Sequence, residues 1–292
     1  MEAILENKYL RLKVKDQGGS MTSIFDKMKN EECLYQPLTN SWQGQDIFIF
    51  PFIARLKDGY YLHNGKKYEF KNHGLIRYMT GDMLCEEKRI IVSFKSSSET
   101  IERYPFNFEA NIIYELIENE IKITYEIINK SNEKLPFELG AHPAFLVPGR
   151  LLNDYFELKG NTITIDKKRK LIQMELEETG SFIKGERIFD ESNVIEVDRE
   201  LFLKENTLIL KASDINEFEL NKINGSKITV KKGDAPFIAI WSDKAWGNYI
   251  CIEPWFGLPD YLDVNREITE KPYMNFVDVG SKFIYSYIIK VN

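Results

Sequence analysis

The stretch that decides the fold is FNFEANIIYELIENEIKITYEI, residues 106–127, in which apolar and polar residues alternate on both sides of a short break. Alternation with a period of two predicts a β-strand with one face on a core and the other in solvent. The break at residues 118–120 is short enough for a tight turn. We therefore predict an antiparallel hairpin formed by residues 106–116 and 120–127.

Strand signals of the same kind recur along most of the chain. They cover residues 9–15, 89–95, 162–166, 207–211, 227–231, 236–242, 249–253 and 282–290. Helical patterns are scarce: residues 170–178 predict one short helix, and the charged, poorly patterned residues 180–200 predict loops. Aromatic residues make up 13% of the chain, and no flexible linker interrupts it. The sequence therefore predicts an all-β fold, a large antiparallel β-sandwich, as a single domain over residues 1–292.

Composition excludes several classes of function. The net charge is −6, and acidic and basic residues are mixed along the chain, which disfavours a nucleic-acid partner. No run of 18 apolar residues predicts a membrane span, and the first residues lack the pattern of a signal peptide. The three cysteines are far apart and odd in number, and Cys251 lies in an apolar run that predicts burial. We expect a reduced, cytoplasmic protein that binds neither nucleic acid nor membranes.

The chain contains three histidines, and two of them lie in short, distinctive segments. His142 is followed by Pro143, which restricts it to an extended backbone and helps to aim the imidazole. His73 precedes a glycine, where it can lie at a strand end that faces a cleft. A packed core histidine is the alternative for His142. His63 lies beside an Asn-Gly pair, which predicts an exposed hairpin turn.

Glu253 is the most suggestive carboxylate, because it lies within the apolar and aromatic run YICIEPWF, residues 249–256. Burial of a carboxylate is costly unless it is hydrogen-bonded or used, and burial raises its pKa towards neutrality. Pro254 is expected to end the pairing of this strand at a cleft, where Trp255 and Phe256 can stack on a sugar ring. The alternative is a structural carboxylate that caps a turn.

Two arginines complete the candidate site. Arg55 interrupts an apolar segment, and Arg77 lies four residues after His73. A guanidinium group can bind two sugar hydroxyls or a phosphate, although either residue could instead form a structural ion pair. Paired cysteines, metal-binding histidine motifs, nucleophile elbows and glycine-rich phosphate loops are all missing from the sequence. We therefore expect no metal and no cofactor. Two imidazoles and a carboxylate suit proton transfer between two oxygens of a sugar.

At these residues the chain resembles the aldose 1-epimerase (galactose mutarotase) superfamily, specifically its LacX-like branch. The likeness runs through nearly the whole chain. It rests on the order of FPFIARLKDG (50–59), NHGLIR (72–77), YPF (104–106), GAHPAF (140–145) and IEPWFGLPD (252–260). The resemblance implies a β-supersandwich that interconverts the α and β anomers of a hexose.

By the same resemblance, Glu253 is the general base that takes the proton of the C1 hydroxyl, and His142 is the general acid that protonates the ring oxygen. His73 and Arg55 would hold sugar oxygens. The two imidazoles and the carboxylate should then converge on one concave site, with Glu253 and the His142 ring about a sugar ring apart. Members of the family often contact the sugar with an aspartate before the strand at residues 207–211, where this chain has Asn206.

Several alternatives stay open. Arg77 resembles an arginine of the branch that acts on hexose 6-phosphates, so Arg55 and Arg77 could form a phosphate clamp. A non-catalytic carbohydrate-binding sandwich would need the same aromatic and polar groups, without an acid and a base at the anomeric centre. A hydrolase or lyase normally uses paired carboxylates, and Glu253 is the one good candidate here.

Overall fold

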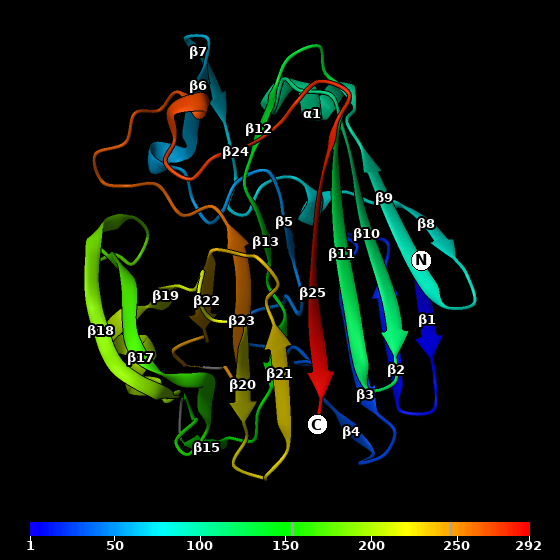
Figure 1. Ribbon diagram of the computed structural model, residues 1–292, viewed down its shortest axis with the longest axis vertical. Helices are drawn as coiled ribbons and strands as arrows, with labels where there is room; N and C mark the ends of the chain where they lie inside the picture. Colours follow the sequence, from blue (N-terminus) through cyan, green and yellow to red (C-terminus); the bar gives the residue numbers. More distant parts are fainter. Residues whose placement is uncertain (153–154, 246) are drawn as a thin grey trace.

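The computed structural model describes residues 1–152, 155–245 and 247–292, and its main element is a large, curved antiparallel sheet (Figure 1). Along this sheet the strands follow the order β5 (Phe48–Ile49), β13 (Leu139–Ala141), β23 (Tyr249–Phe256), β22 (Phe237–Trp241), β19 (Thr207–Lys211), β17 (Thr162–Leu176), β20 (Glu217–Asn221), β21 (Lys227–Lys231), β25 (Lys282–Val291), β11 (Glu120–Asn129), β10 (Phe108–Ile117), β9 (Arg89–Lys95) and β8 (Asp82–Cys85). In addition, β14 (Ala144–Leu146) pairs with β23, and β18 (Ile183–Glu196) pairs with β17.

Smaller elements surround this sheet. A second sheet contains β1 (Glu2–Glu6), β2 (Leu10–Lys15), β3 (Met21–Asp26) and β4 (Glu31–Glu32). Paired short strands are β6 (Tyr60–His63) with β7 (Lys66–Glu69), β12 (Leu135–Phe137) with β24 (Asn275–Val277), and β15 (Arg150–Leu152) with β16 (Tyr155–Glu157). The helices are α1 (Ser98–Arg103), α2 (Arg199–Glu205) and three 3-10 turns at Lys57–Gly59, Ile76–Tyr78 and Ile268–Glu270. Among the described residues, no helix has both the length and the apolar character needed to cross a membrane.

The predicted hairpin is confirmed as β10 and β11. Its register pairs Ile112 with Tyr125 and Ile117 with Glu120, so the turn falls at the predicted break. The side chains of Ile112, Tyr114 and Tyr125 are at most 1% exposed, because alternate positions on both strands point into the core. The strand β9 pairs along the other edge of β10 and extends the same buried face.

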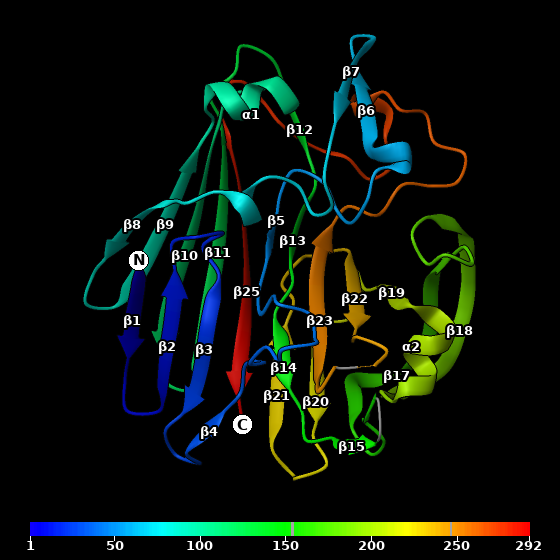
Figure 2. The ribbon, with the colours of Figure 1, turned by 180° about the vertical axis from the view of Figure 1, so that it is seen from behind.

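The second sheet packs face to face on this part of the large sheet. Figure 1 and Figure 2, seen from opposite sides, both show β1, β2 and β3 lying against β9, β10 and β11. Val14 and Ile24 are fully buried, and they belong to the same apolar cluster as Ile112 and Tyr285. The predicted all-β sandwich is therefore confirmed.

Two local predictions are wrong. Residues 170–178, predicted to be helical, lie mostly in the strand β17, and residues 180–200, predicted to be loops, form most of the strand β18. The long β17–β18 pair contains register shifts between Thr164 and Arg169, between Leu171 and Ile172, and between Glu175 and Leu176. Along β17 the buried side changes only once, from odd positions such as Leu171 and Gln173 to even positions such as Met174 and Leu176, and residues 166–168 are exposed. A bulged strand of this kind shows no simple alternation in its sequence.

The predicted hairpin around Asn64 and Gly65 is confirmed as β6–β7, but the exposure of His63 is not. His63 is 8% exposed, and its ring packs 4.8 Å from that of Phe106. A carboxylate oxygen of Glu133 lies 3.5 Å from its Nε2 atom. His63 therefore joins this hairpin to the body of the molecule and takes no part in the site described below.

Candidate active site

A cavity of about 600 Å³ opens above the part of the large sheet formed by β13, β23, β22, β19 and β17. This volume falls within the range of small-molecule sites. All seven site residues expected from the sequence line it: Glu253, His142, His73, Arg55, Arg77, Trp255 and Asn206. The predicted convergence of His73, His142 and Glu253 on one concave site is therefore confirmed.

Glu253 projects from β23 into the floor of the cavity. Alternation along the strand places Cys251, Glu253 and Trp255 on one face. On that face the register puts the small side chain of Ala239 opposite Glu253, and Ile209 lies next beyond Ala239. A small residue beside the carboxyl group leaves space above it, where a ligand can approach.

The expected end of the strand at Pro254 is wrong. Pro254 pairs with Ile238, and β23 continues to Phe256 between the neighbouring strands β22 and β13. Phe256 points to the opposite face of the sheet and packs on Phe283 and Tyr285, with ring centroids 5.2 Å and 4.7 Å away. Of the two aromatic residues expected to contact a sugar, the cavity therefore has Trp255 alone.

The carboxyl group of Glu253 is almost fully buried, with 1% of the residue exposed. Burial raises its pKa well above the ordinary value, and the nearby Trp255 indole lowers it in part. The Oε2 atom of Glu253 and the Nε1 atom of Trp255 have no hydrogen-bond partner among the described residues. A proton on Glu253 is therefore favoured in the unliganded protein, and its free oxygen can serve a ligand.

His142 lies between β13 and β14, and aromatic rings hold its imidazole on several sides. The ring centroids of Trp42, Trp241 and His73 are 4.9 Å, 5.7 Å and 5.4 Å from that of His142. Burial, aided by the positive charge of Arg77, lowers the pKa of His142 to about 3. His142 is therefore neutral near pH 7.

The distance between the two expected catalytic groups is shorter than a sugar ring. Nε2 of His142 lies 3.5 Å from Oε1 of Glu253. The expectation that a sugar ring would separate them is wrong in the unliganded state. Both groups line the cavity, so a sugar bound there could meet each of them with a different oxygen.

His73 occupies a strained backbone position beside a glycine. Its φ is +59°, in the left-handed region, and Gly74 follows with φ +79°. A Cβ atom on Gly74 would lie 2.0 Å from the carbonyl oxygen of Phe50, so only glycine allows this approach. The Ala54 N–H donates to Nδ1 of His73 at 3.3 Å. Burial and the neighbouring His142 lower the pKa of His73 well below its usual range, so this ring is also neutral.

Neither arginine of the cavity has an acidic partner among the described residues. Arg55 is exposed, and the Arg77 guanidinium lies 5.1 Å from the ring centroid of Tyr78. Both line the cavity with Glu253 as its one acidic residue in the described chain. The structural ion pairs considered for these arginines are therefore absent from the described residues, and the cavity favours a ligand with negative charge or many hydroxyl groups.

Asn206 reaches the cavity from the end of α2. Its backbone adopts φ +60° and ψ −67°, and its Nδ2 atom donates to the carbonyl oxygen of Gly180 at 2.9 Å. The Oδ1 atom is thereby left as an acceptor for a ligand hydroxyl. A Cβ atom on Gly180 would collide with the Asn206 side chain, so the glycine permits this contact.

Several cavity residues were not predicted from the sequence. Trp42 and Trp241 form aromatic walls, and Thr179 and Ser181 come from the turn that joins β17 to β18. Trp42 follows a segment without strand or helix periodicity. The turn between β17 and β18 was not predicted either, because the irregular burial pattern of these strands does not show where they end.

Three groups that could bind a metal ion lie close together, and two of them, His142 and Glu253, line the cavity. Ligand atoms of His142, Cys251 and Glu253 all lie within 4.8 Å of one another. Burial raises the pKa of the Cys251 thiol well above its ordinary value, and a thiol must lose its proton to bind a metal. This chemistry does not fit a resident metal, and Cys251 is the buried small residue predicted from the sequence.

Comparisons of sequence and of structure with known proteins agree with one another. A model of the family described as aldose 1-epimerase matches residues 2–271. Protein LacX (plasmid) of Lactococcus lactis subsp. lactis is 26% identical over 287 residues, which cover 94% of this chain and 93% of that protein. A galactose mutarotase related enzyme from Lactobacillus acidophilus superposes with a TM-score of 0.92 at 26% identity, covering 100% of this chain and 97% of that one.

A second solved structure shares the fold. A galactose mutarotase-like protein from Lactobacillus casei ATCC 334 superposes with a TM-score of 0.91 at 22% identity and covers 100% of both chains. These similarities confirm the galactose mutarotase-like sandwich expected from the sequence.

Proposed function

The chain belongs to the aldose 1-epimerase family, and we propose that it interconverts the α and β anomers of a hexose by general acid–base ring opening and closure. The observation that carries this proposal is the contact of His142 Nε2 with Glu253 Oε1, 3.5 Å apart at the floor of a sugar-sized cavity. A carboxyl group and an imidazole so placed can exchange protons with two oxygens of one substrate.

In the proposed reaction, Glu253 takes the proton of the C1 hydroxyl as the C1–O1 bond becomes a carbonyl. The bond between C1 and the ring oxygen breaks, and its electron pair goes to the ring oxygen, which takes a proton from His142. Rotation about the C1–C2 bond turns the other face of the carbonyl towards the ring oxygen. Ring closure then returns both protons and gives the other anomer, so the protein ends in its starting state.

The pKa shifts suit this cycle if the pair holds one proton between its two members. Burial raises the pKa of Glu253 and lowers that of His142, so the resting protein favours a neutral carboxyl and a neutral imidazole. The pair reaches these same protonation states after ring opening, when Glu253 has taken a proton and His142 has given one up. Binding of the closed sugar requires the proton on His142, and the short distance allows it to move there from Glu253.

The remaining residues would hold the sugar. The Trp255 indole offers an apolar surface for the ring, and Asn206 offers Oδ1 as an acceptor for a hydroxyl. Arg55 and the neutral His73 donate to sugar oxygens. None of these roles needs a cofactor. One apolar cluster contains residues from β1 to β25, so we propose that the chain acts as one domain. The described cysteines are free, which supports our proposal that the protein works in the cytoplasm.

Polarimetry tests the proposal. Freshly dissolved α-glucose and α-galactose should reach their equilibrium rotation faster with catalytic amounts of protein than without it. Acceleration should saturate with sugar concentration and vanish in the Glu253→Gln variant. If the protein binds sugars without any acceleration, it is a carbohydrate-binding sandwich and the catalytic proposal is wrong.

A second candidate is a hexose 6-phosphate mutarotase with the same chemistry. It is favoured by Arg55 and Arg77, which line the cavity without an acidic partner among the described residues. Their guanidinium groups could hold the phosphate while Glu253 and His142 act at C1. The same polarimetric measurement with glucose 6-phosphate and galactose 6-phosphate distinguishes this candidate by its higher kcat/KM.

A further inference from the structure

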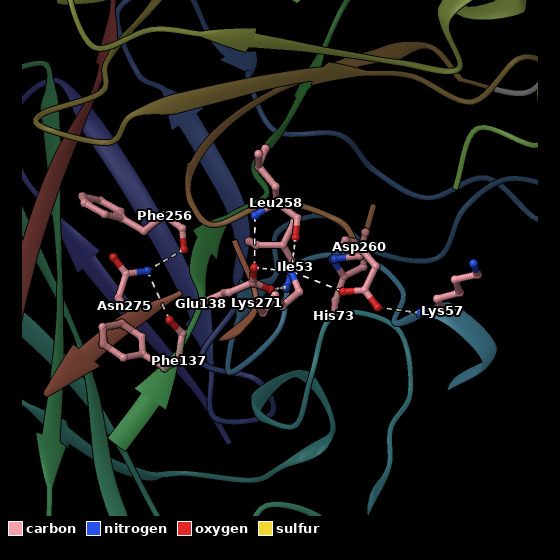
Figure 3. A network of polar contacts seen from close by, with 11 residues as sticks. Ile53, Lys57, His73, Phe137, Glu138, Phe256, Leu258, Asp260, Lys271 and Asn275 are labelled. Atoms are coloured by element: carbon pink, nitrogen blue, oxygen red, sulfur yellow. Dashed lines mark hydrogen bonds and ion pairs between the residues drawn. The ribbon is translucent and has the colours of Figure 1, made fainter. Parts of the chain in front are cut away.

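A fully buried carboxylate that lies outside the cavity connects two of its walls. Glu138, with none of its surface exposed, lies between β12 and β13 (Figure 3). Its Oε2 atom accepts the N–H of Ile53 at 2.8 Å, and its Oε1 atom accepts the N–H of Leu258 at 3.1 Å. The next residues along the chain, Ala54 and Pro259, both line the cavity. One side chain therefore fixes two segments that are about 200 residues apart in sequence, and each belongs to the site.

Other groups hold Glu138 itself in place. The Lys271 ammonium donates to its Oε1 atom and to the carbonyl oxygen of Leu258, and it lies 3.5 Å from a carboxylate oxygen of Asp260. The Asn275 amide bridges the carbonyl oxygens of Phe137 and Phe256 at 3.1 Å and 3.0 Å (Figure 3). Burial of such an ion pair is a poor route to stability, because desolvation of both charges opposes it. Accurate placement of the backbone is a better reason for the pair.

The segment that Glu138 fixes, Ile53 and Ala54, forms hydrogen bonds with both the ring and the backbone of His73. Ile53 is followed by Ala54, whose φ of +51° is unusual for a residue with a side chain. In this conformation the Ala54 N–H donates to Nδ1 of His73, and the Ala54 carbonyl accepts the His73 N–H at 2.9 Å. An Nδ1 atom that accepts a hydrogen bond carries no proton, so the single proton of the neutral ring must be on Nε2. Nε2 has no partner among the described residues.

We propose that Glu138 and Lys271 act as positioning residues for His73. By fixing Ile53, they hold the Ala54 N–H against Nδ1 and keep His73 as a neutral ring with its proton on Nε2. His73 then meets a sugar as a hydrogen-bond donor and cannot act as a base. The inference about the sugar rests on the proposed function, whereas the protonated nitrogen of His73 is a property of the free protein.

Nuclear magnetic resonance of the wild-type protein gives the first test. Since the chain has three histidines, a long-range ¹H–¹⁵N correlation spectrum shows at most three imidazole patterns. His63→Gln and His142→Asn variants assign the signals. At pH 7 we expect His73 to show a bare Nδ1 and a protonated Nε2. A proton on Nδ1, or rapid averaging of the two forms, in the wild-type protein would overturn the inference however the variants behave.

Substitutions give the second test. Glu138→Gln weakens the hydrogen bonds from Glu138 to the Ile53 and Leu258 N–H groups. If the unpaired Lys271 ammonium prevents this variant from folding, the double variant Glu138→Gln with Lys271→Met replaces it. We expect the His73 signals to move towards an average of the two forms. We expect kcat/KM per folded molecule to fall about 10–100-fold, the size of effect that misplacement of a catalytic group produces.

The control is Asn129→Ala. Asn129 is also buried and donates to a backbone carbonyl, that of Val277, at 2.8 Å, but it lies away from the cavity. This variant should lose stability and keep both the His73 signals and kcat/KM. Folded Glu138 variants with unchanged signals and activity would show that the pair is merely structural. A wild-type protein that carries the expected proton on Nε2 and never accelerates mutarotation would instead contradict the proposed function alone.

Discussion

His142 lies directly opposite Glu253 in an interrupted strand pair. The strand β23 pairs with β13 through Gly140 and Trp255, and with β14 through Ala144 and Cys251. Continuing this antiparallel register across the gap places residue 142 opposite residue 253, and Nε2 of His142 is indeed 3.5 Å from Oε1 of Glu253. Pro143 interrupts the ladder at this position. The pair is therefore a product of strand register, and the sheet itself holds the two groups together.

Removal of the carboxyl group tests this pair most directly. Glu253→Gln keeps the shape of the side chain and removes its ability to exchange a proton, so we expect mutarotation to fall by at least ~100-fold with folding nearly unchanged. His142→Asn should act similarly. Polarimetry and thermal unfolding measure the two effects. The control is Glu126→Gln, a change on β11 away from the cavity, which should leave the rate unchanged. Near-normal rates in the Glu253 variant would favour a binding module.

The pH dependence of the rate should lack the inflection of an ordinary histidine. In the proposed reaction the pair acts while it holds one proton, and a second proton must bind to His142, whose pKa burial lowers to about 3. Since Glu253 has a raised pKa, its proton is retained up to a pH well above the usual carboxyl range. We expect kcat/KM to stay nearly constant between about pH 5 and 7. An acid limb with a midpoint near 6.5 would show that His142 titrates normally and would contradict this account.

The predictable part of the structure is the part with regular alternation. Residues 106–127 and the neighbouring strands keep a period of two over their whole length, and their hairpin was found at the right turn. The predicted strand at residues 162–166 is the start of β17, but the rest of β17 and all of β18 were missed because their irregular pairing breaks that period. A pattern of buried and exposed positions predicts an element only where the element is regular.

The site was predictable where rare residue types identify it. Glu253 in an apolar run and His142 before a proline could be selected from the sequence, but their separation could not, because it depends on the register of β13 and β14 on β23. Glu138 and Lys271 could not be selected either. They are one carboxylate and one lysine among many charged residues, and only the fold reveals that both are buried.

A buried carboxylate elsewhere gives a prediction on stability. Asp46 is 3% exposed, and burial raises its pKa to about 6. Between about pH 4 and 6 the folded protein therefore binds a proton that the unfolded chain has lost, so the stability contributed by Asp46 falls as pH rises through this window. Relative to Asp46→Asn, the wild type should lose roughly 2 kcal/mol between pH 4 and 7. Urea unfolding of both proteins at pH 4 and pH 7 measures this loss of stability. If the stability difference between wild type and Asp46→Asn is the same at both pH values, Asp46 keeps an ordinary pKa.

Gly74 allows a prediction with an internal control. Alanine at this position would combine a φ of +79° with a Cβ atom 2.0 Å from the Phe50 carbonyl oxygen. Gly65 has a similar φ of +75° and open space around it. We expect Gly65→Ala to cost about 1 kcal/mol, from the left-handed backbone alone, and Gly74→Ala to cost more than about 2 kcal/mol. Equal losses in thermal unfolding would mean that the contact with Phe50 relaxes at little cost.

Under the proposed function, the charge of the cavity bears on whether the hexose is free or phosphorylated. Arg77 has no acidic partner among the described residues and lies at the cavity wall with Arg55, so a phosphate bound there would receive charge-assisted hydrogen bonds. If this is the natural ligand, galactose 6-phosphate should bind more tightly than galactose, and added salt should weaken its binding. Calorimetric titration measures both affinities. Arg77→Met should then lower the affinity for the phosphate ester by about 10-fold or more and leave that for the free sugar nearly unchanged.

The matched control for this last experiment is Arg89→Met. Arg89 lies on β9 and pairs with Glu86 at the surface, away from the cavity, so its loss should change neither affinity. Equal affinities of the wild type for galactose and galactose 6-phosphate would end the idea of a phosphate clamp. The two arginines would then act as donors to the hydroxyl groups of a neutral hexose, and Arg77→Met should weaken the binding of both sugars alike.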